Sequence, residues 1–304
     1  MKKRIAAIII ALCLVAIPRA GKAAGMGIGM TTWFVWWKPY FTLSPGESMS
    51  LKRETSNNPS FLYGPVLSFY LPKHVTITTT FLYGEFPIKI DEVNMSLNFI
   101  FPQKTRYLIK RYDSDSAITY SFARFFSMYL GFKYTKFKFK SNEISALDEI
   151  VFYEKIKKQY DEYAPALGFG FTIPLVEKTL YLLFNGSVIF DFVALQGSTT
   201  TLAFMNIMPL EVTLLPQKPI KQNMYKIGMN STLSLAYYVD VINTTFSLGF
   251  RYQMFKMLNT DSTLNIKLNK LYDHFYGITA AVIYRVNFPE KKTEGSDSPQ
   301  TTKK

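Results

Sequence analysis

Histidine, the side chain best suited to acid–base chemistry near neutral pH, occurs twice in this chain of 304 residues, as His74 and His274. His274 directly follows Asp273, and a separate acidic pair is formed by Asp113 and Asp115. The members of this pair are two residues apart, so on a strand their side chains would share one face. An acidic pair that faced an Asp/His pair could activate a water for hydrolysis. Asp113, Asp115, Asp273 and His274 are therefore the catalytic candidates.

Other features of the sequence make an enzyme the weaker interpretation. Adjacent residues on a strand point to opposite faces, which works against a joint role for Asp273 and His274. Neither histidine is followed by a hydroxyl nucleophile at a useful spacing. The only cysteine is Cys13, and the sequence contains no glycine-rich phosphate loop and no metal-spaced cluster. We predict no cofactor and no metal, and the alternative role of the candidates is a solvated loop tip and a histidine at the rim.

A second set of polar residues alternates with apolar ones in the last third of the chain. This set comprises Lys226, Asn230, Asp240, Arg251, Gln253 and Arg285. On adjacent strands these side chains would share one face and could line a narrow, mildly cationic passage. They could equally form internal salt bridges that close and stiffen a barrel. We predict them to be lumen-lining and leave both roles open.

The segment 275–288 shows what kind of element carries these residues. One face is apolar at a period of two, namely Tyr276, Ile278, Ala280, Val282, Tyr284, Val286 and Phe288. The other face is mixed and mostly small or polar. Similar alternation recurs along most of the chain, and no later window offers the long apolar run of a membrane helix. This combination is typical of a transmembrane β-barrel, whose strands face lipid on one side and the lumen on the other.

The spacing of the alternating segments predicts an all-β, antiparallel barrel. Four links are short, at 71–74, around 124, at 174–178 and at 239–242. Five intervening segments are long, at 38–60, 85–116, 139–163, 193–224 and 257–273. Short periplasmic turns that alternate with long extracellular loops give ten strands. If 92–101 pairs with 107–112 as an extra hairpin, the count is twelve, and a short surface helix is expected within 141–163.

The ends of the chain have different compositions. Residues 1–23 combine Lys2, Lys3 and Arg4 with an apolar run and a small-residue exit, which predicts a signal peptide. Residues 289–304 have little to bury and predict a disordered tail after a barrel at 24–288. The net charge of +13 includes five cations of the signal, leaving about +8. Export makes nucleic acid an improbable partner and anionic lipopolysaccharide a better one.

Aromatic and basic residues suggest where the membrane surface lies. Trp33, Trp36 and Trp37 are expected to belong to an interfacial aromatic girdle, with carbohydrate stacking as the alternative. Lys136, Lys138 and Lys140 alternate with phenylalanine beyond the predicted lipid band. They could neutralise phosphates of outer-leaflet lipopolysaccharide or simply solvate the rim.

On these patterns the chain resembles Gram-negative outer-membrane β-barrel proteins between about Met26 and Phe288. Its last strand, with Tyr284, Val286 and Phe288, is similar to the aromatic-ended signal read by the barrel-insertion machinery. The resemblance implies a location in the bacterial outer membrane, transit with periplasmic chaperones and insertion by that machinery. Within such barrels, omptin proteases place an acidic pair opposite an Asp/His pair at the outer rim, which is the arrangement considered for the catalytic candidates.

The function that the sequence favours is a small, porin-like channel for the passive passage of small solutes. A sealed barrel that acts as an adhesin or surface-interaction protein through its external loops is the alternative from another class. An omptin-like rim hydrolase comes third. A lumen lined by the late-strand charges would favour the channel, and a fully paired, plugged lumen would favour the surface-interaction protein.

Overall fold

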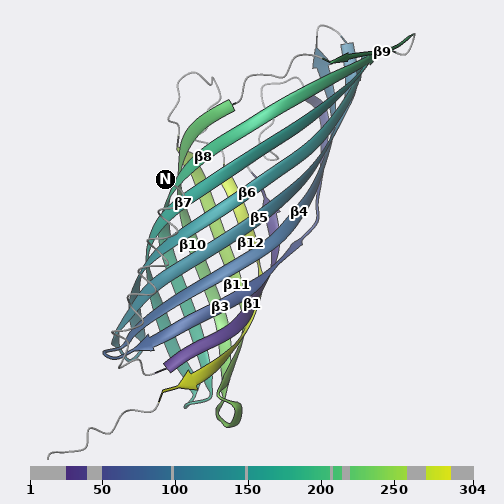
Figure 1. Cartoon of the computed structure of the whole chain (residues 1–304). Coiled ribbons are helices and arrows are strands. Elements are labelled where there is room, and N and C mark those ends of the chain that lie inside the picture. Colours follow the sequence, from purple (N-terminus) through teal and green to yellow (C-terminus); the bar gives the residue numbers. More distant parts are fainter. Residues whose placement is uncertain are drawn as a thin grey trace, which may run out of the picture.

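A closed antiparallel barrel of ten strands forms the body of the protein (Figure 1). The computed structural model describes residues 25–39, 50–96, 99–147, 150–205, 208–213, 220–258 and 272–288. The barrel strands are β1 (Gly25–Lys38), β3 (Ser60–Leu71), β4 (Val75–Ser96), β5 (Phe99–Ala123), β6 (Phe126–Leu147), β7 (Ile150–Val176), β8 (Leu180–Met205), β10 (Ile220–Val239), β11 (Thr244–Leu258) and β12 (Tyr272–Asn287). Two short strands lie off the ring: β2 (Ser50–Asn57) pairs with β4, and β9 (Met208–Thr213) pairs with β8.

Two pairings close the ring between strands that are distant in sequence. The first strand, β1, pairs with the last, β12, over the full length from Gly25↔Asn287 to Lys38↔His274. Strand β8 pairs with β10 and thereby bypasses β9. The predicted signal at 1–23 and the predicted tail at 289–304 lie outside the described residues. The described part of the chain contains no helix long and apolar enough to cross a membrane.

The four short links are tight turns, as predicted. They lie between β3 and β4, β5 and β6, β7 and β8, and β10 and β11, where the last contains the 3-10 turn η1 (Asp240–Ile242). The ten-strand count is confirmed over the twelve-strand alternative. Where they are described, residues 92–101 form the distal ends of β4 and β5, and 107–112 lies in the middle of β5; the two strands pair with each other from Val75↔Tyr120 to Ser96↔Phe99. They do not form a separate hairpin of the ring.

The prediction of long external loops was wrong for much of three segments. Where 85–116, 139–163 and 193–224 are described, they are mostly strand, because β4 to β8 continue as hairpins well beyond a membrane-spanning length. These strands have 22 to 27 residues, whereas about 9–11 suffice to cross a bilayer. The helix expected within 141–163 is also absent from the described residues there, which belong to β6 and β7. One wall of the barrel therefore projects outward as a long curved sheet (Figure 1).

The two faces of the strands exchange character along the projecting wall. Near the turns, the outward face is apolar and exposed, for example Met128, Leu130 and Phe132 on β6. Farther along β6, the inward face becomes apolar with the buried Phe137, and outward positions become basic with the exposed Lys138. Lipid contact explains the first arrangement, and contact with water over an internal core explains the second.

A ring of aromatic side chains marks the level at which this exchange occurs. Each barrel strand contributes one outward residue: Trp36, Tyr63, Tyr83, Tyr112, Tyr134, Tyr163, Phe192, Tyr225, Tyr252 and Tyr276. Several neighbouring rings are in contact, as for Trp36 and Tyr276, whose centroids are 6.0 Å apart. Such a ring is typical of a membrane–water interface, and we call these ten residues the outer girdle.

The tryptophan prediction was correct only for Trp36. Trp33 and Trp37 lie inside the barrel and are almost completely buried, at 1% and 2% exposure. Successive side chains on a strand point to opposite faces, so Trp33 and Trp37, four residues apart, share the inward face and Trp36 points outward.

Candidate functional site

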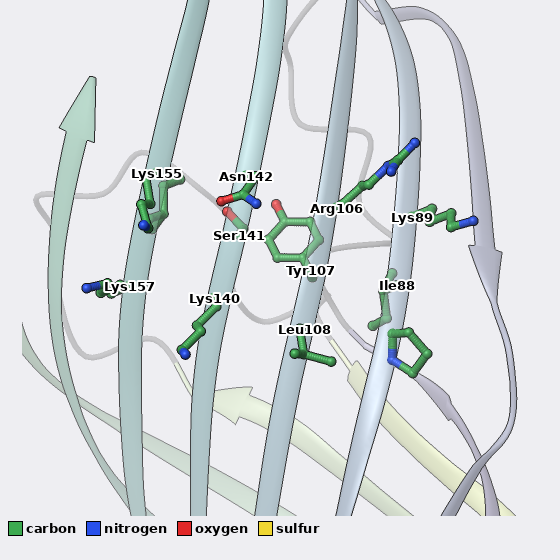
Figure 2. Close-up of a pocket in the computed structure, with 12 residues that line it drawn as sticks. Ile88, Lys89, Arg106, Tyr107, Leu108, Lys140, Ser141, Asn142, Lys155 and Lys157 are labelled. Carbon is green, nitrogen blue, oxygen red and sulfur yellow. The ribbon is translucent and has the colours of Figure 1, made fainter. Parts of the chain in front are cut away.

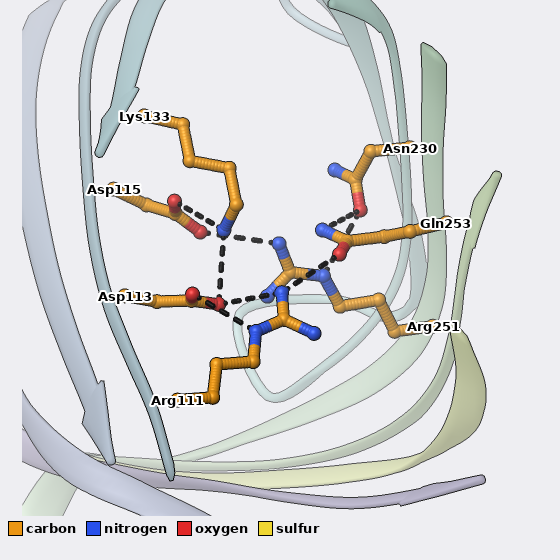
Figure 3. A network of polar contacts seen from close by, with 7 residues as sticks. All are labelled: Arg111, Asp113, Asp115, Lys133, Asn230, Arg251 and Gln253. Carbon is orange, nitrogen blue, oxygen red and sulfur yellow. Dashed lines mark hydrogen bonds and ion pairs between the residues drawn. The ribbon is translucent and has the colours of Figure 1, made fainter. Parts of the chain in front are cut away.

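A buried ion network lies across the lumen close to the level of the outer girdle (Figure 3). Arg111 on β5 binds Asp113 through two hydrogen bonds, from Nε at 2.9 Å and from Nη2 at 2.8 Å. Lys133 on β6 donates to Asp113 at 3.0 Å and to Asp115 at 2.7 Å. The side chains of Arg111 and Asp113 are each only 1% exposed. Ion pairs removed from water in this way need dense hydrogen bonding to be tolerated, and this network supplies it.

Residues of the opposite wall complete the network. Arg251 on β11 reaches Asp115 at 3.1 Å and donates to Asn230 on β10 at 2.9 Å. The amide of Gln253 is fully buried among Arg111, Arg251 and Asn230. Because β5 and β11 lie on different walls, these contacts connect the two sides of the lumen (Figure 3).

A second buried ion cluster joins β7, β10 and β12. Lys226 on β10 contacts Glu162 on β7 at 2.5 Å and Asp273 on β12 at 3.6 Å. All three side chains are at most 8% exposed. Trp37 also donates its indole N–H to Asp273 at 3.4 Å. This cluster connects β10, which also carries Asn230 of the first network, to β7 and β12 through side chains that point inward.

An aromatic core covers the ion network. The Arg111 guanidinium lies 4.3 Å from the ring centroid of Phe275 and 5.5 Å from that of Trp33, distances at which cation–π attraction acts. Trp37 stacks on Phe275 at 5.2 Å and meets Phe86 edge-on at 5.1 Å. These residues belong to one buried cluster that continues into the projecting wall.

Most described side chains of this layer are therefore shielded from water, although Asp115 and Arg251 remain 27% and 14% exposed. A water-filled pore would expose inward-facing side chains, whereas Arg111, Gln253, Trp33 and Trp37 are at most 2% exposed. Below the network, toward the turns, many inward positions are small or hydroxylated, such as Thr78, Gly170 and Ser187. A cavity of about 150 Å³ lies there, bounded by residues that include Thr78, Tyr129 and Ser187.

The six predicted lumen residues occupy three different places. Lys226, Asn230, Arg251 and Gln253 take part in the two ion clusters. Arg285 lies nearer the turns, with its guanidinium 4.5 Å from the ring of Tyr70. Asp240 lies in the exposed turn η1, because β10 has already ended at Val239.

The four catalytic candidates do not converge on one water site. Asp113 and Asp115 lie within β5, not at an external loop tip as expected, and bind the cations described above. Asp273 faces inward and is 4% exposed. His274 faces outward, where its Nδ1 lies 3.0 Å from the hydroxyl of Tyr252. Among the described residues, no three metal-ligating acidic, histidine or cysteine side chains gather.

Sequence reasoning missed Arg111, Lys133 and Glu162 as members of the site. Arg111 and Glu162 fell in segments predicted to be loops. Lys133 lay in a predicted strand, and its inward parity, opposite to that of Leu130 and Phe132, was a usable signal.

These features define the class of protein. A closed β-barrel with an apolar outer band, an aromatic girdle and a polar interior is an outer-membrane-type transmembrane barrel. Its site is a layer of buried, paired charges in the lumen, in contact with an aromatic core.

No family model matches the chain. No curated protein sequence matches it either. Three solved structures illustrate what the chain is similar to. The translocator domain of the autotransporter NalP from Neisseria meningitidis is 10% identical, with 92% of this chain and 96% of that chain covered and a TM-score of 0.49. The outer membrane protease OmpT from Escherichia coli is 10% identical, with 87% and 97% covered and a TM-score of 0.45. The toluene transporter TodX from Pseudomonas putida is 8% identical, with 87% and 90% covered and a TM-score of 0.33. At such identities and scores, none of the three bears on what this chain does.

Proposed function

We propose that this protein is a sealed barrel of the bacterial outer membrane that acts as a surface-interaction protein through its projecting wall, β4 to β8. The observation that carries the proposal is the burial of the charged layer, with Arg111 and Asp113 1% exposed at the centre of the lumen. A passage for solutes would have to break several buried, mutually paired charges, each of which is costly to leave alone.

The length of the projecting wall supports the same function. Strands β5, β7 and β8 have 25 to 27 residues, far more than a membrane crossing needs. Their distal parts bury apolar residues on the inner face, such as Ile109 on β5 and Val193 and Leu195 on β8, and carry polar or charged residues on much of the outer face, which suits a structure in water. Such a wall offers a large, ordered surface outside the membrane.

The porin-like channel favoured by the sequence remains a prediction, and a measurement of conductance tests it. Refolded protein is inserted into a planar bilayer, after a heat-dependent gel shift has verified folding. We expect inserted protein to give no discrete current steps. Steps that scale with salt in the wild-type protein would overturn the sealed-barrel proposal and restore the channel.

A variant with an opened lumen serves as the positive control. In Trp37→Ala/Arg251→Ala, the aromatic core loses a ring and the ion network loses its connection between Asp115 and Asn230. We expect this variant to conduct if it folds. If the variant gives current steps and the wild type gives none, the assay detects an open barrel of this size and the absence of current in the wild type is meaningful.

A further inference from the structure

A shallow groove of about 530 Å³ crosses four strands on the projecting wall (Figure 2). Each of β4, β5, β6 and β7 contributes three consecutive residues to it. The middle residue of each triplet points inward, and two of these, Ile88 and Ser141, are 1% and 2% exposed. Their side chains therefore do not form the groove. The flanking residues point outward, so the groove lies on the outer surface of the wall with backbone as its floor.

Five cations flank this groove: Lys89, Arg106, Lys140, Lys155 and Lys157. All five are exposed, and within the described part of the chain none of them forms an ion pair. They are spread across the strands in Figure 2, with Lys155 and Lys157 on one side and Lys89 and Arg106 on the other. We call these five residues the basic groove.

The strand register places like charges opposite each other along the groove. Lys89 pairs with Arg106 across β4 and β5, and Lys140 pairs with Lys157 across β6 and β7. Like charges directly opposite on neighbouring strands destabilise a sheet. Another lysine on the same wall does have a carboxylate partner: Lys110 Nζ lies 2.7 Å from Glu85 Oε1. The hydrogen bond from Lys110 holds the pKa of the Glu85 carboxyl below its usual value. The basic groove lacks such partners and would be neutralised by an external anion.

The height of the basic groove above the membrane indicates the source of the anion. On β5, Leu108 and Arg106 lie four and six residues beyond the girdle residue Tyr112. With roughly 3.4 Å per residue and a tilt near 40°, the groove lies about 10–16 Å above the girdle. A headgroup layer extends only about 5–8 Å beyond the hydrocarbon core, so a groove at this height would face the sugars that lie above the lipid phosphates.

We infer that the basic groove binds the phosphorylated core sugars of an outer-leaflet glycolipid, lipopolysaccharide. Several spaced cations over four strands match a sugar chain that carries several phosphates. The alkyl stems of the lysines, Pro87 and Leu108 give the groove apolar surface for sugar rings. The inference depends on the orientation of the barrel and not on whether the lumen conducts, so it can fail separately from the proposed function.

The test measures binding to the refolded protein in a neutral detergent by native mass spectrometry. The ligands are intact lipopolysaccharide, the same material with its core phosphates removed, lipid A alone, and phosphatidylglycerol. We expect the intact glycolipid to bind at least about tenfold more tightly than the others, since one cation at an anionic surface contributes on the order of fivefold. Equal binding of the intact and dephosphorylated forms would overturn the inference. Equal binding of lipid A would instead place the recognised phosphates in the lipid headgroup and overturn the core-sugar assignment.

Two double variants distinguish binding at the basic groove from general electrostatic attraction to the protein surface. Lys140→Gln/Lys157→Gln removes two cations of the basic groove. Lys38→Gln/Lys256→Gln removes two outward cations of the other wall, which lie beside Tyr276 and Tyr272. We expect the groove variant to lose affinity for the intact glycolipid by about 25-fold, from two such contributions, and the control to stay within about twofold of wild type. Equal losses of affinity in the two variants would show that binding depends on overall positive charge and would overturn the proposal.

Discussion

The residue with most consequence for the lumen is Asp113, because two buried cations donate three hydrogen bonds to it. It accepts two hydrogen bonds from Arg111 and one from Lys133. Sequence reasoning selected this aspartate for its spacing from Asp115, and the shared face was a valid inference. The role could not be read from spacing alone, since its partners come from two strands and one of them lay in a predicted loop.

Asp113→Ala is predicted to lower the free energy of unfolding by about 3–5 kcal/mol, because it leaves Arg111 buried without its carboxylate partner and removes one of the two carboxylates that bind Lys133. Urea unfolding of the refolded protein in detergent measures this. The matched control is Asp240→Ala in the exposed turn η1, which should change stability by less than about 0.5 kcal/mol. Comparable effects of the two substitutions would contradict a structural role for the network.

At the scale of elements, the sequence predicted the lipid-facing strands and their turns well. A period of two with an apolar outward face is a strong signal where lipid covers that face. The projecting parts of β4 to β8 escaped it because the apolar residues change faces beyond the girdle. In β5, for example, Lys110 faces outward and the buried Ile109 faces inward, within the segment 85–116 that was predicted to be a loop. The alternation continues across this change, but the apolar residues now face inward and the polar ones outward. The charged outward residues were therefore interpreted as belonging to loops.

The turn between β3 and β4 contains backbone strain that a substitution by glycine can relieve. Lys73 and His74 both have a φ of 61°, in the left-handed region that non-glycine residues adopt at a cost of about 1–2 kcal/mol each. His74→Gly is therefore predicted to raise the free energy of unfolding by about 0.5–1 kcal/mol, after the entropy that glycine adds to the unfolded chain.

Urea unfolding at equilibrium measures this effect as well. Thr76→Gly, two residues along in β4 with extended pairing to Tyr70, is the control and should be destabilising. If His74→Gly destabilises the protein as much as Thr76→Gly does, the turn does not have the backbone conformation described here.

At the scale of the whole molecule, the barrel is asymmetric along the membrane normal. Tight turns close one end, and the projecting wall with its basic groove extends from the other. The proposed function and the glycolipid site both require the wall to lie outside the cell. The arrangement of short turns and long hairpins supports that orientation, because barrels of this class keep the short turns in the periplasm.

Cysteine labelling on intact cells tests the orientation directly. Val241, 94% exposed in η1, reports on the turn end, and Lys155, exposed in the basic groove, reports on the projecting wall. The only native cysteine is Cys13, so the unmodified protein provides the background. With a maleimide that cannot cross the outer membrane, Lys155→Cys should be labelled on intact cells and Val241→Cys only after the membrane is permeabilised. The opposite result would place the wall in the periplasm, where it could meet neither an external partner nor lipopolysaccharide, and both proposals would fall together.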